Sequence, residues 1–110
     1  MNIIDEYTNE RGISPYAQWM EKLRDKRAKA KIILQVDKME LGLLDDVEPI
    51  GDGLSELRIH YGPGYRVYFG KVRQHTYLLI CGGDKSTQSR DIRNAKEFWK
   101  ASRRRYDHDT

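Results

Sequence analysis

The sequence has few of the features that mark secreted or membrane-embedded proteins. Cys81 is its single cysteine, which excludes an internal disulfide and a zinc site built on paired cysteines. No apolar run approaches the roughly 20 residues needed to cross a bilayer. The opening stretch MNIIDEYTNE is acidic where a secretory signal is basic and then apolar. We therefore predict a cytoplasmic protein with no membrane contact, folded as a single domain over residues 1–110, because this length allows one hydrophobic core.

Positive charge is concentrated in the second part of the chain. Residues 1–48 contain 8 Lys and Arg against 10 Asp and Glu, whereas residues 49–110 contain 12 against 7. The overall net charge of +3 therefore originates in the C-terminal part. Such an excess favours a polyanionic partner, because Lys and Arg neutralise phosphates and release counterions. An ordinary solvated surface explains the charge alone equally well.

Two amphipathic helices are predicted in the first part. Ser14 and Asp25 can each cap a helix start, and Pro15 suits the first helical position. Apolar residues then recur at three- and four-residue spacing. The first stripe is Tyr16, Trp19, Met20 and Leu23, and the second is Ala28, Ile32, Val36, Met39 and Leu43. We expect a helical hairpin packed on an apolar surface, followed by a linker over residues 45–53, where Pro49, Gly51 and Gly53 favour turns.

After this linker the apolar residues alternate, as in β-strands. Leu57, Ile59 and Tyr61 alternate with Glu56, Arg58 and His60, and a turn at residues 62–64 leads to a second strand over residues 65–69. The apolar run at residues 77–81 predicts a central strand, and Ile3, Ile4 and Tyr7 suit a short opening strand. A basic amphipathic helix follows around residues 92–99, ending at Arg103, Arg104 and Arg105 with disordered residues beyond. The predicted fold is α+β, with the helical hairpin on one face of an antiparallel sheet and a basic C-terminal helix.

Four polar or aromatic side chains are expected on the sheet face away from the helical hairpin. Because side chains alternate along strands, Arg58, His60, Arg66 and Tyr68 should project together from that face. Two arginines and a histidine across one hairpin repel each other unless an anion lies between them, and a phosphate fits that role. An ordinary solvated sheet face is the alternative.

These residue types suit metal-independent cleavage of RNA. The 2′-hydroxyl attacks the adjacent phosphate while His60 transfers a proton and Arg58, Arg66 and Lys85 stabilise the phosphoryl charge. Tyr65 or Tyr68 can stack on a base, and Arg90 and Arg93 on the basic helix are further RNA-binding candidates. We predict no metal site and no cofactor, since Asp84, Asp91 and His60 lack the spacing of metal ligands. Spacing alone does not establish whether Lys85 reaches the same surface.

Two longer segments resemble a known protein family. ELRIHYGPGYRVYF (residues 56–69) and LLICGGDKSTQSRDIRNAKEFW (residues 78–99) resemble the RelE/ParE superfamily of toxins, and most closely its HigB-like branch of addiction module killer proteins. The IIDEY opening and the SPYAQWMEKL helix look like the same branch, so the resemblance covers nearly the whole chain.

The resemblance implies a type II toxin that cleaves messenger RNA on the ribosome and inhibits translation. It also implies neutralisation by a helix-turn-helix antitoxin in a hetero-oligomer. We expect this antitoxin to be acidic where it meets the sheet face or the cluster of Arg103, Arg104 and Arg105. Arg66 falls on the arginine of the family's GYR motif, which contacts the scissile phosphate, and Lys85 falls near another catalytic basic residue. The family's C-terminal catalytic tyrosine has no counterpart near Arg90 and Asp91. Related HigB toxins use histidine and aspartate, so His60 and Asp91 are candidates to replace it. A ParE-like inhibitor of DNA gyrase and a non-catalytic nucleic-acid-binding module remain alternatives, because fold alone does not distinguish them.

Overall fold

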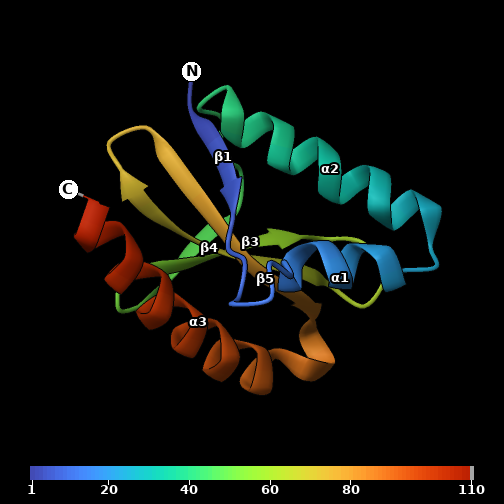
Figure 1. Ribbon diagram of the computed structural model, residues 1–110. Coiled ribbons are helices and arrows are strands. Elements are labelled where there is room, and N and C mark those ends of the chain that lie inside the picture. Colours follow the sequence, from blue (N-terminus) through green and yellow to red (C-terminus); the bar gives the residue numbers. More distant parts are fainter. Residues whose placement is uncertain (110) are drawn as a thin grey trace.

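Five strands and three α-helices make up the computed structural model, which describes residues 1–109 (Figure 1). The elements in chain order are β1 (Ile3–Glu6), α1 (Pro15–Lys22), α2 (Lys26–Glu40), β2 (Val47–Gly51), β3 (Leu54–Ile59), β4 (Tyr65–Arg73), β5 (Thr76–Asp84), a short 3₁₀ helix η1 (Lys85–Thr87) and α3 (Gln88–Asp109). The α+β class predicted from the sequence is thereby confirmed.

The sheet is mixed and not purely antiparallel as predicted. Its strand order is β1-β5-β4-β3-β2, and β1 pairs with β5 in parallel while the other neighbours are antiparallel. The parallel pair arises because both α1 and α2 lie in the long connection between β1 and the rest of the sheet. The predicted opening strand and the buried strand at residues 77–81 are both present.

The helix starts follow the predicted capping chemistry. The Ser14 hydroxyl accepts a hydrogen bond from Ala17 N at 3.0 Å, and Pro15 occupies the first position of α1. The Asp25 carboxylate accepts from Arg27 N and Ala28 N at the start of α2. The stripe of α2 packs as predicted except for Leu43, which lies beyond the helix end at Glu40 and is exposed.

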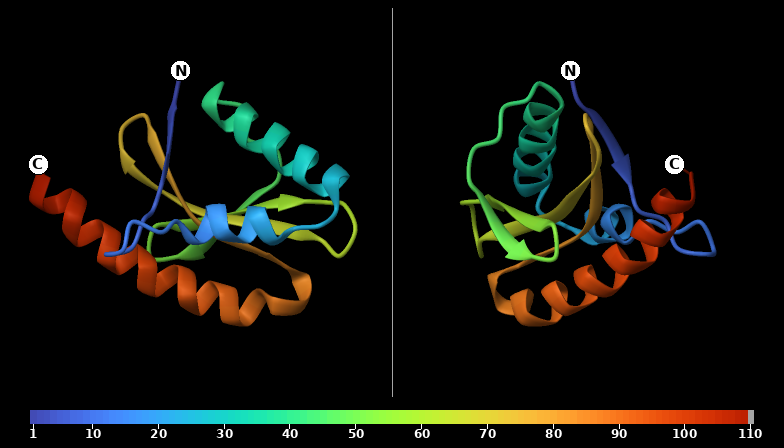
Figure 2. Two further views of the ribbon diagram at one scale, coloured as in Figure 1. Left: turned by 45° about the vertical axis from the view of Figure 1, so that its right-hand side comes forward. Right: turned by 90° about the vertical axis from the view of Figure 1, so that its left-hand side faces the viewer.

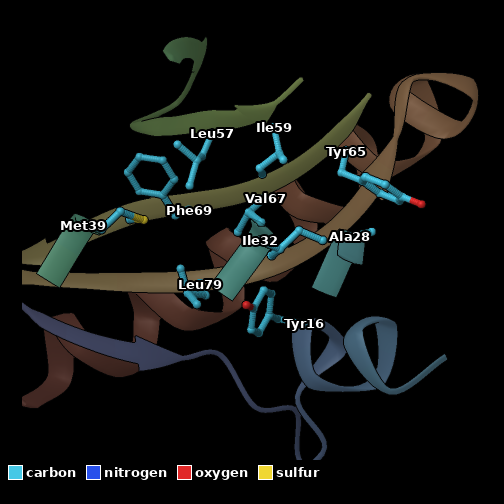
Figure 3. Close-up of a cluster of buried hydrophobic side chains, with 10 residues drawn as sticks. All are labelled: Tyr16, Ala28, Ile32, Met39, Leu57, Ile59, Tyr65, Val67, Phe69 and Leu79. Atoms are coloured by element: carbon cyan, nitrogen blue, oxygen red, sulfur yellow. The ribbon is translucent and has the colours of Figure 1, made fainter. Parts of the chain in front are cut away.

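Helices α1 and α2 cover one face of the sheet with a continuous apolar core (Figure 3). In this core the α2 residues Ala28, Ile32 and Met39 are fully buried. They meet alternate side chains of the central strands, among them Leu57, Val67, Phe69 and Leu79. The strand alternation predicted for β3 and β4 is therefore confirmed on this face.

Helix α3 covers the opposite face, which the sequence predicted to be open (Figure 2). Trp99 lies directly over Gly70 of β4, where a Cβ atom would approach the indole Cη2 within 2.4 Å. Tyr7, Leu54, Ile80 and Ala95 complete a second apolar core. The sheet is thus sandwiched between two helical layers, and the expectation of helices on one side only is wrong.

The predicted linker contains an edge strand. Val47–Gly51 forms β2 and pairs with β3, and Pro49 is tolerated there because an edge strand leaves one row of backbone N–H groups unpaired. Asp52 and Gly53 form the connecting turn with φ values of 59° and 87°. An Asp-Gly pair is a strong hairpin signal, so this strand was detectable in the sequence.

Helix α3 also extends further than predicted. It continues through Asp109, past the expected end at Arg105. The disorder expected of the last few residues stays a prediction, because Thr110 lies outside the described residues. Within residues 1–109, no helix combines the length and the apolar character needed to traverse a bilayer.

Candidate nucleic-acid interface

The tyrosines predicted to stack on RNA bases are buried. Tyr68 points to the face covered by α3 and is 0% exposed, and burial raises the pKa of its phenol. Tyr65 faces the other core, is 8% exposed, and packs beside Trp19 with a ring separation of 6.2 Å. Neither ring has a face open to a nucleobase, so the stacking prediction is wrong for both.

Arg66 is held at the margin of α3 by a buried carboxylate. Its Nε lies 3.3 Å from Glu56 Oε2, an approach that forms an ion pair but falls outside hydrogen-bond geometry. The Glu56 side chain is 5% exposed, and Gln88 Nε2 donates to both of its oxygens at 3.1 and 3.4 Å. Arg66 Nη1 also donates to Gly64 O at 3.0 Å. Residues of β3, β4 and α3 therefore fix the orientation of this guanidinium.

Lys85 reaches the same end of the sheet as Arg66. A Cβ atom on Gly64 would lie 3.7 Å from Arg66 Nη1 and 3.8 Å from Lys85 Cβ, so this turn lies between the two side chains. Lys85, Arg90 and Arg93 together line a hollow of about 380 Å³ at the start of α3. We call these three residues, with Arg66 beside them, the basic corner. The question that sequence spacing left open for Lys85 is resolved in favour of proximity to Arg66.

Arg58 and His60 lie in a different hollow. This hollow, of about 260 Å³, is lined by both residues together with Asp46 and residues of α2. Arg58 Nη2 lies 2.6 Å from Glu48 Oε2 and 3.1 Å from Asp46 Oδ1, and His60 Nε2 also pairs with Asp46. The hydrogen bond from His60, with added attraction from Arg58, lowers the pKa of Asp46.

The predicted cluster of unpaired cations on one sheet face is therefore wrong. Arg58 and Arg66 are cross-strand partners, as the hairpin register required, but each is neutralised by carboxylates of the chain itself. These carboxylates relieve the repulsion that the sequence argument assigned to an external phosphate. Within the basic corner, the exposed cations are Lys85 on η1 and Arg90 and Arg93 on α3, and Arg90 Nη2 lies 3.4 Å from Asp91 Oδ1.

Two further polar groups near the start of α3 are structural. Asp91 is 6% exposed and accepts a hydrogen bond from the Thr87 hydroxyl. Burial raises the pKa of the neighbouring Cys81 thiol to about 12, as expected for a small buried side chain. Among the side chains that the structure describes, through Tyr106, no three His, Cys, Asp or Glu side chains gather closely enough to form a metal-binding group.

The residues that sequence reasoning missed are Glu56 and Gln88. Glu56 belongs to the same polar alternation that predicted Arg58 and His60, and its negative charge beside two arginines was the available signal. Gln88 carried no such signal, because its contact with Glu56 depends on how α3 lies across the sheet.

Comparison with known proteins identifies a relative but no described family. No protein-family model matches the sequence. An uncharacterized protein of Haemophilus influenzae is 44% identical over 81 residues, which cover 74% of this chain and 82% of that protein. Identity at this level over most of both chains implies a common fold and ancestry. The chain therefore belongs to the same family as this Haemophilus influenzae protein.

Proposed function

We propose that the chain is the toxin of a type II toxin-antitoxin system, a RelE/ParE-type ribonuclease of the HigB-like branch. On this proposal it cleaves messenger RNA on the ribosome without a metal ion, and a helix-turn-helix antitoxin neutralises it. The proposal starts from the resemblance of residues 56–69 and 78–99 to this superfamily. It adds a location for the chemistry, the basic corner.

The observation that carries the proposal is the proximity of Arg66 and Lys85. The resemblance assigns Arg66 to the scissile phosphate and places Lys85 near another catalytic basic residue, although the two are far apart in the sequence. The Arg66 Nη1 atom and the Lys85 Cβ atom both lie within 4 Å of the same Gly64 Cβ position. Two cationic residues that begin at one turn, with Arg90 and Arg93 around the adjoining hollow, suit a single phosphate and its neighbours.

The basic corner would act mainly by stabilising charge. The 2′-hydroxyl would give its proton to water and attack the phosphorus, and negative charge would gather on the phosphoryl oxygens. The bond to the 5′-oxygen would then break, this oxygen taking a proton from water and leaving a 2′,3′-cyclic phosphate. Arg66 and Lys85 would stabilise that charge, and the Glu56 carboxylate would keep Arg66 oriented before the substrate arrives. His60 is assigned no proton transfer at this corner, because it lines the other hollow and pairs with Asp46.

The position of His60 also favours a second candidate, a ParE-like inhibitor of DNA gyrase. A hollow lined by Lys85, Arg90 and Arg93 binds a polyanion or an acidic protein surface without any proton transfer. In that case the same four cations would serve binding alone. The two candidates differ in whether messenger RNA is cut.

The test is inducible expression of the chain alone in a bacterial host. We expect growth arrest, with new 5′ ends in messenger RNA that form in translating extracts only when ribosomes are present. Lys85→Ala should lower the cleavage rate about 100-fold, the usual cost of losing one charge-stabilising donor. Lys71→Ala is the matched control, because Lys71 is exposed on β4 away from the basic corner.

Arg66 requires a conservative variant. Arg66→Ala would leave the Glu56 carboxylate buried without its cation, so loss of activity could reflect unfolding. Arg66→Lys keeps a positive charge near Glu56 but removes the planar guanidinium, and it should also slow cleavage. Normal growth with abundant folded protein would refute the toxin proposal, and intact messages with supercoiling defects would establish the gyrase candidate.

A further inference from the structure

A cleft separate from the basic corner lies between the loop after β1 and the C-terminal half of α3. Both views in Figure 2 place this loop beside α3. The cleft measures about 730 Å³, and arginines from opposite ends of the chain meet across it. Arg11 comes from the loop, and Arg104 and Arg105 come from α3. We call it the arginine cleft.

The loop that presents Arg11 is held by its own hydrogen bonds. Asn9 Oδ1 accepts from Arg11 N at 2.9 Å and from Ile13 N at 3.1 Å. Arg105 Nη1 donates to Thr8 O at 3.3 Å and ties the loop to α3. Arg11 therefore has a backbone position that is set before any ligand binds, which lowers the entropic cost of binding.

The charge of the arginine cleft is positive. Among the lining residues through Tyr106, Glu10 is the one carboxylate, against three guanidinium groups. Among side chains through Tyr106, neither Arg11 nor Arg104 takes part in an ion pair. This differs from Arg58 and Arg66 on the sheet, which pair with carboxylates of the chain. A guanidinium matches a phosphate group with two parallel N–H donors and is weakly hydrated, so it favours phosphate as the ligand.

The remaining lining suits a nucleotide. Gln18 contributes a side-chain amide, and Tyr7, Ile13 and Ala101 contribute apolar surface. The volume falls within the roughly 300 to 1,000 Å³ typical of ligand-binding pockets. A nucleotide has an anionic phosphate that the arginines can bind and a flat base that can pack against the apolar lining residues.

The outer face of α3 connects the arginine cleft with the basic corner. Arg90, Arg93, Lys100 and Arg104 are all exposed, at spacings that bring them to one side of the helix. Arg90 and Arg104 are separated by about 21 Å along the axis at 1.5 Å per residue. Glu97 is exposed on the same side and lies 4.0 Å from Lys100, so the cations of this side outnumber its carboxylate but do not form an unbroken row. A mainly cationic side of this length matches a chain with one phosphate per nucleotide, and single-stranded sites of about 4 to 16 nucleotides are common. This continuity favours RNA over an acidic polypeptide.

We propose that the arginine cleft binds the backbone of single-stranded RNA and that α3 guides the strand between this cleft and the basic corner. The choice of RNA rests on the proposed function, whereas the cleft itself rests on Arg11, Arg104 and Arg105. The proposal extends the RNA-binding surface to a loop that the sequence analysis assigned no role.

The test measures binding of a fluorescein-labelled single-stranded oligoribonucleotide by fluorescence anisotropy over a series of salt concentrations. The full chain carries Lys85→Ala, so that the probe stays intact even if the wild type cleaves it. The test variant adds Arg11→Ala and Arg104→Ala. The control variant instead adds Arg24→Ala and Arg27→Ala, which remove two exposed arginines near α2.

The test variant should lower the slope of log K against log salt by about 0.7 for each lost phosphate contact, or about 1.4 in total. At 0.1 M salt this corresponds to roughly 25-fold weaker binding. The control variant should bind like its parent. Equal effects of the two variants would overturn the proposal. Poly-glutamate, measured in the same way, serves as a model of an acidic protein. If the test variant loses binding to poly-glutamate but binds RNA as its parent does, the cleft binds an acidic protein and the proposal is refuted. If the wild type arrests growth while the test variant binds RNA as tightly as its parent, RNA binding by the arginine cleft is refuted and the toxin proposal stays intact.

Discussion

Glu56→Gln tests whether a buried carboxylate holds Arg66 in place. The substitution keeps the shape and one acceptor oxygen of the side chain but removes its negative charge. Arg66 would then stay nearly buried, at 12% side-chain exposure, beside a neutral partner. The Gln88 side chain would also lose one of its two acceptors.

The expected loss of stability is about 3 kcal/mol, the lower end of the range for removing one partner of a buried ion pair. The lower end applies because the new amide oxygen still accepts a hydrogen bond. Glu97→Gln is the matched control, since Glu97 lies 4.0 Å from Lys100 and both side chains are mostly exposed. Solvent screens such a pair, so its loss should cost about 0 to 1 kcal/mol.

Urea unfolding followed by tryptophan fluorescence measures both variants. We expect a lower midpoint for Glu56→Gln with an unchanged slope, because the surface exposed on unfolding stays the same. Adding Arg66→Met should restore most of the lost stability, because the double variant no longer buries an unpaired charge. If Glu56→Gln and Glu97→Gln have equal costs, Glu56 does not hold Arg66, and the account of the basic corner loses its support.

Three further predictions concern the two cores. Gly70→Ala should destabilise the fold by about 1 to 3 kcal/mol in urea unfolding, because the new methyl group would overlap Trp99; an unchanged midpoint would mean that α3 can shift freely. Burial raises the pKa of Tyr16 from 10.0 to about 12, so its contribution to stability is complete below pH 10 and is lost as the pH rises towards 12. Tyr16→Phe should therefore flatten the decline of the free energy of unfolding over this range, and a parallel decline would contradict the assignment. Burial also raises the pKa of Cys81 to about 12, so an alkylating reagent at pH 8 should label the thiol only in urea.

Sequence patterns among neighbouring residues predicted the helices and strands, but not which face of the sheet each helix covers. The caps at Ser14 and Asp25 and the alternation in β3 and β4 depend on neighbours in sequence, and these predictions are confirmed. Which face of the sheet α3 covers depends on contacts between distant residues. Gly70 beneath Trp99 was the hint, because a strand glycine often marks close approach of another element.

The candidate site was predicted in part for the same reason. Arg58 and Arg66 were correctly placed on one sheet face, but that face was assumed to be open. Where α3 covers that face, at Glu56 and Arg66, a charge needs a partner within the protein, because burying an unpaired charge is costly. Glu56 pairs with Arg66 there, whereas Arg58, whose side chain is 29% exposed, pairs with Asp46 and Glu48 in the hollow beside α2.

Helix α3 thereby determines where a polyanion can bind. Its inner side closes the second core through Ala95 and Trp99, and its outer side carries Arg90, Arg93 and Arg104 into solvent. The positive charge that the sequence placed on the sheet is largely neutralised, whereas the charge on the helix is exposed along its length. A nucleic acid would therefore meet the helix first and reach Arg66 only at the end where Lys85 adjoins it. Binding and chemistry would then be separable, because the residues that attract the strand differ from those that act on its phosphate.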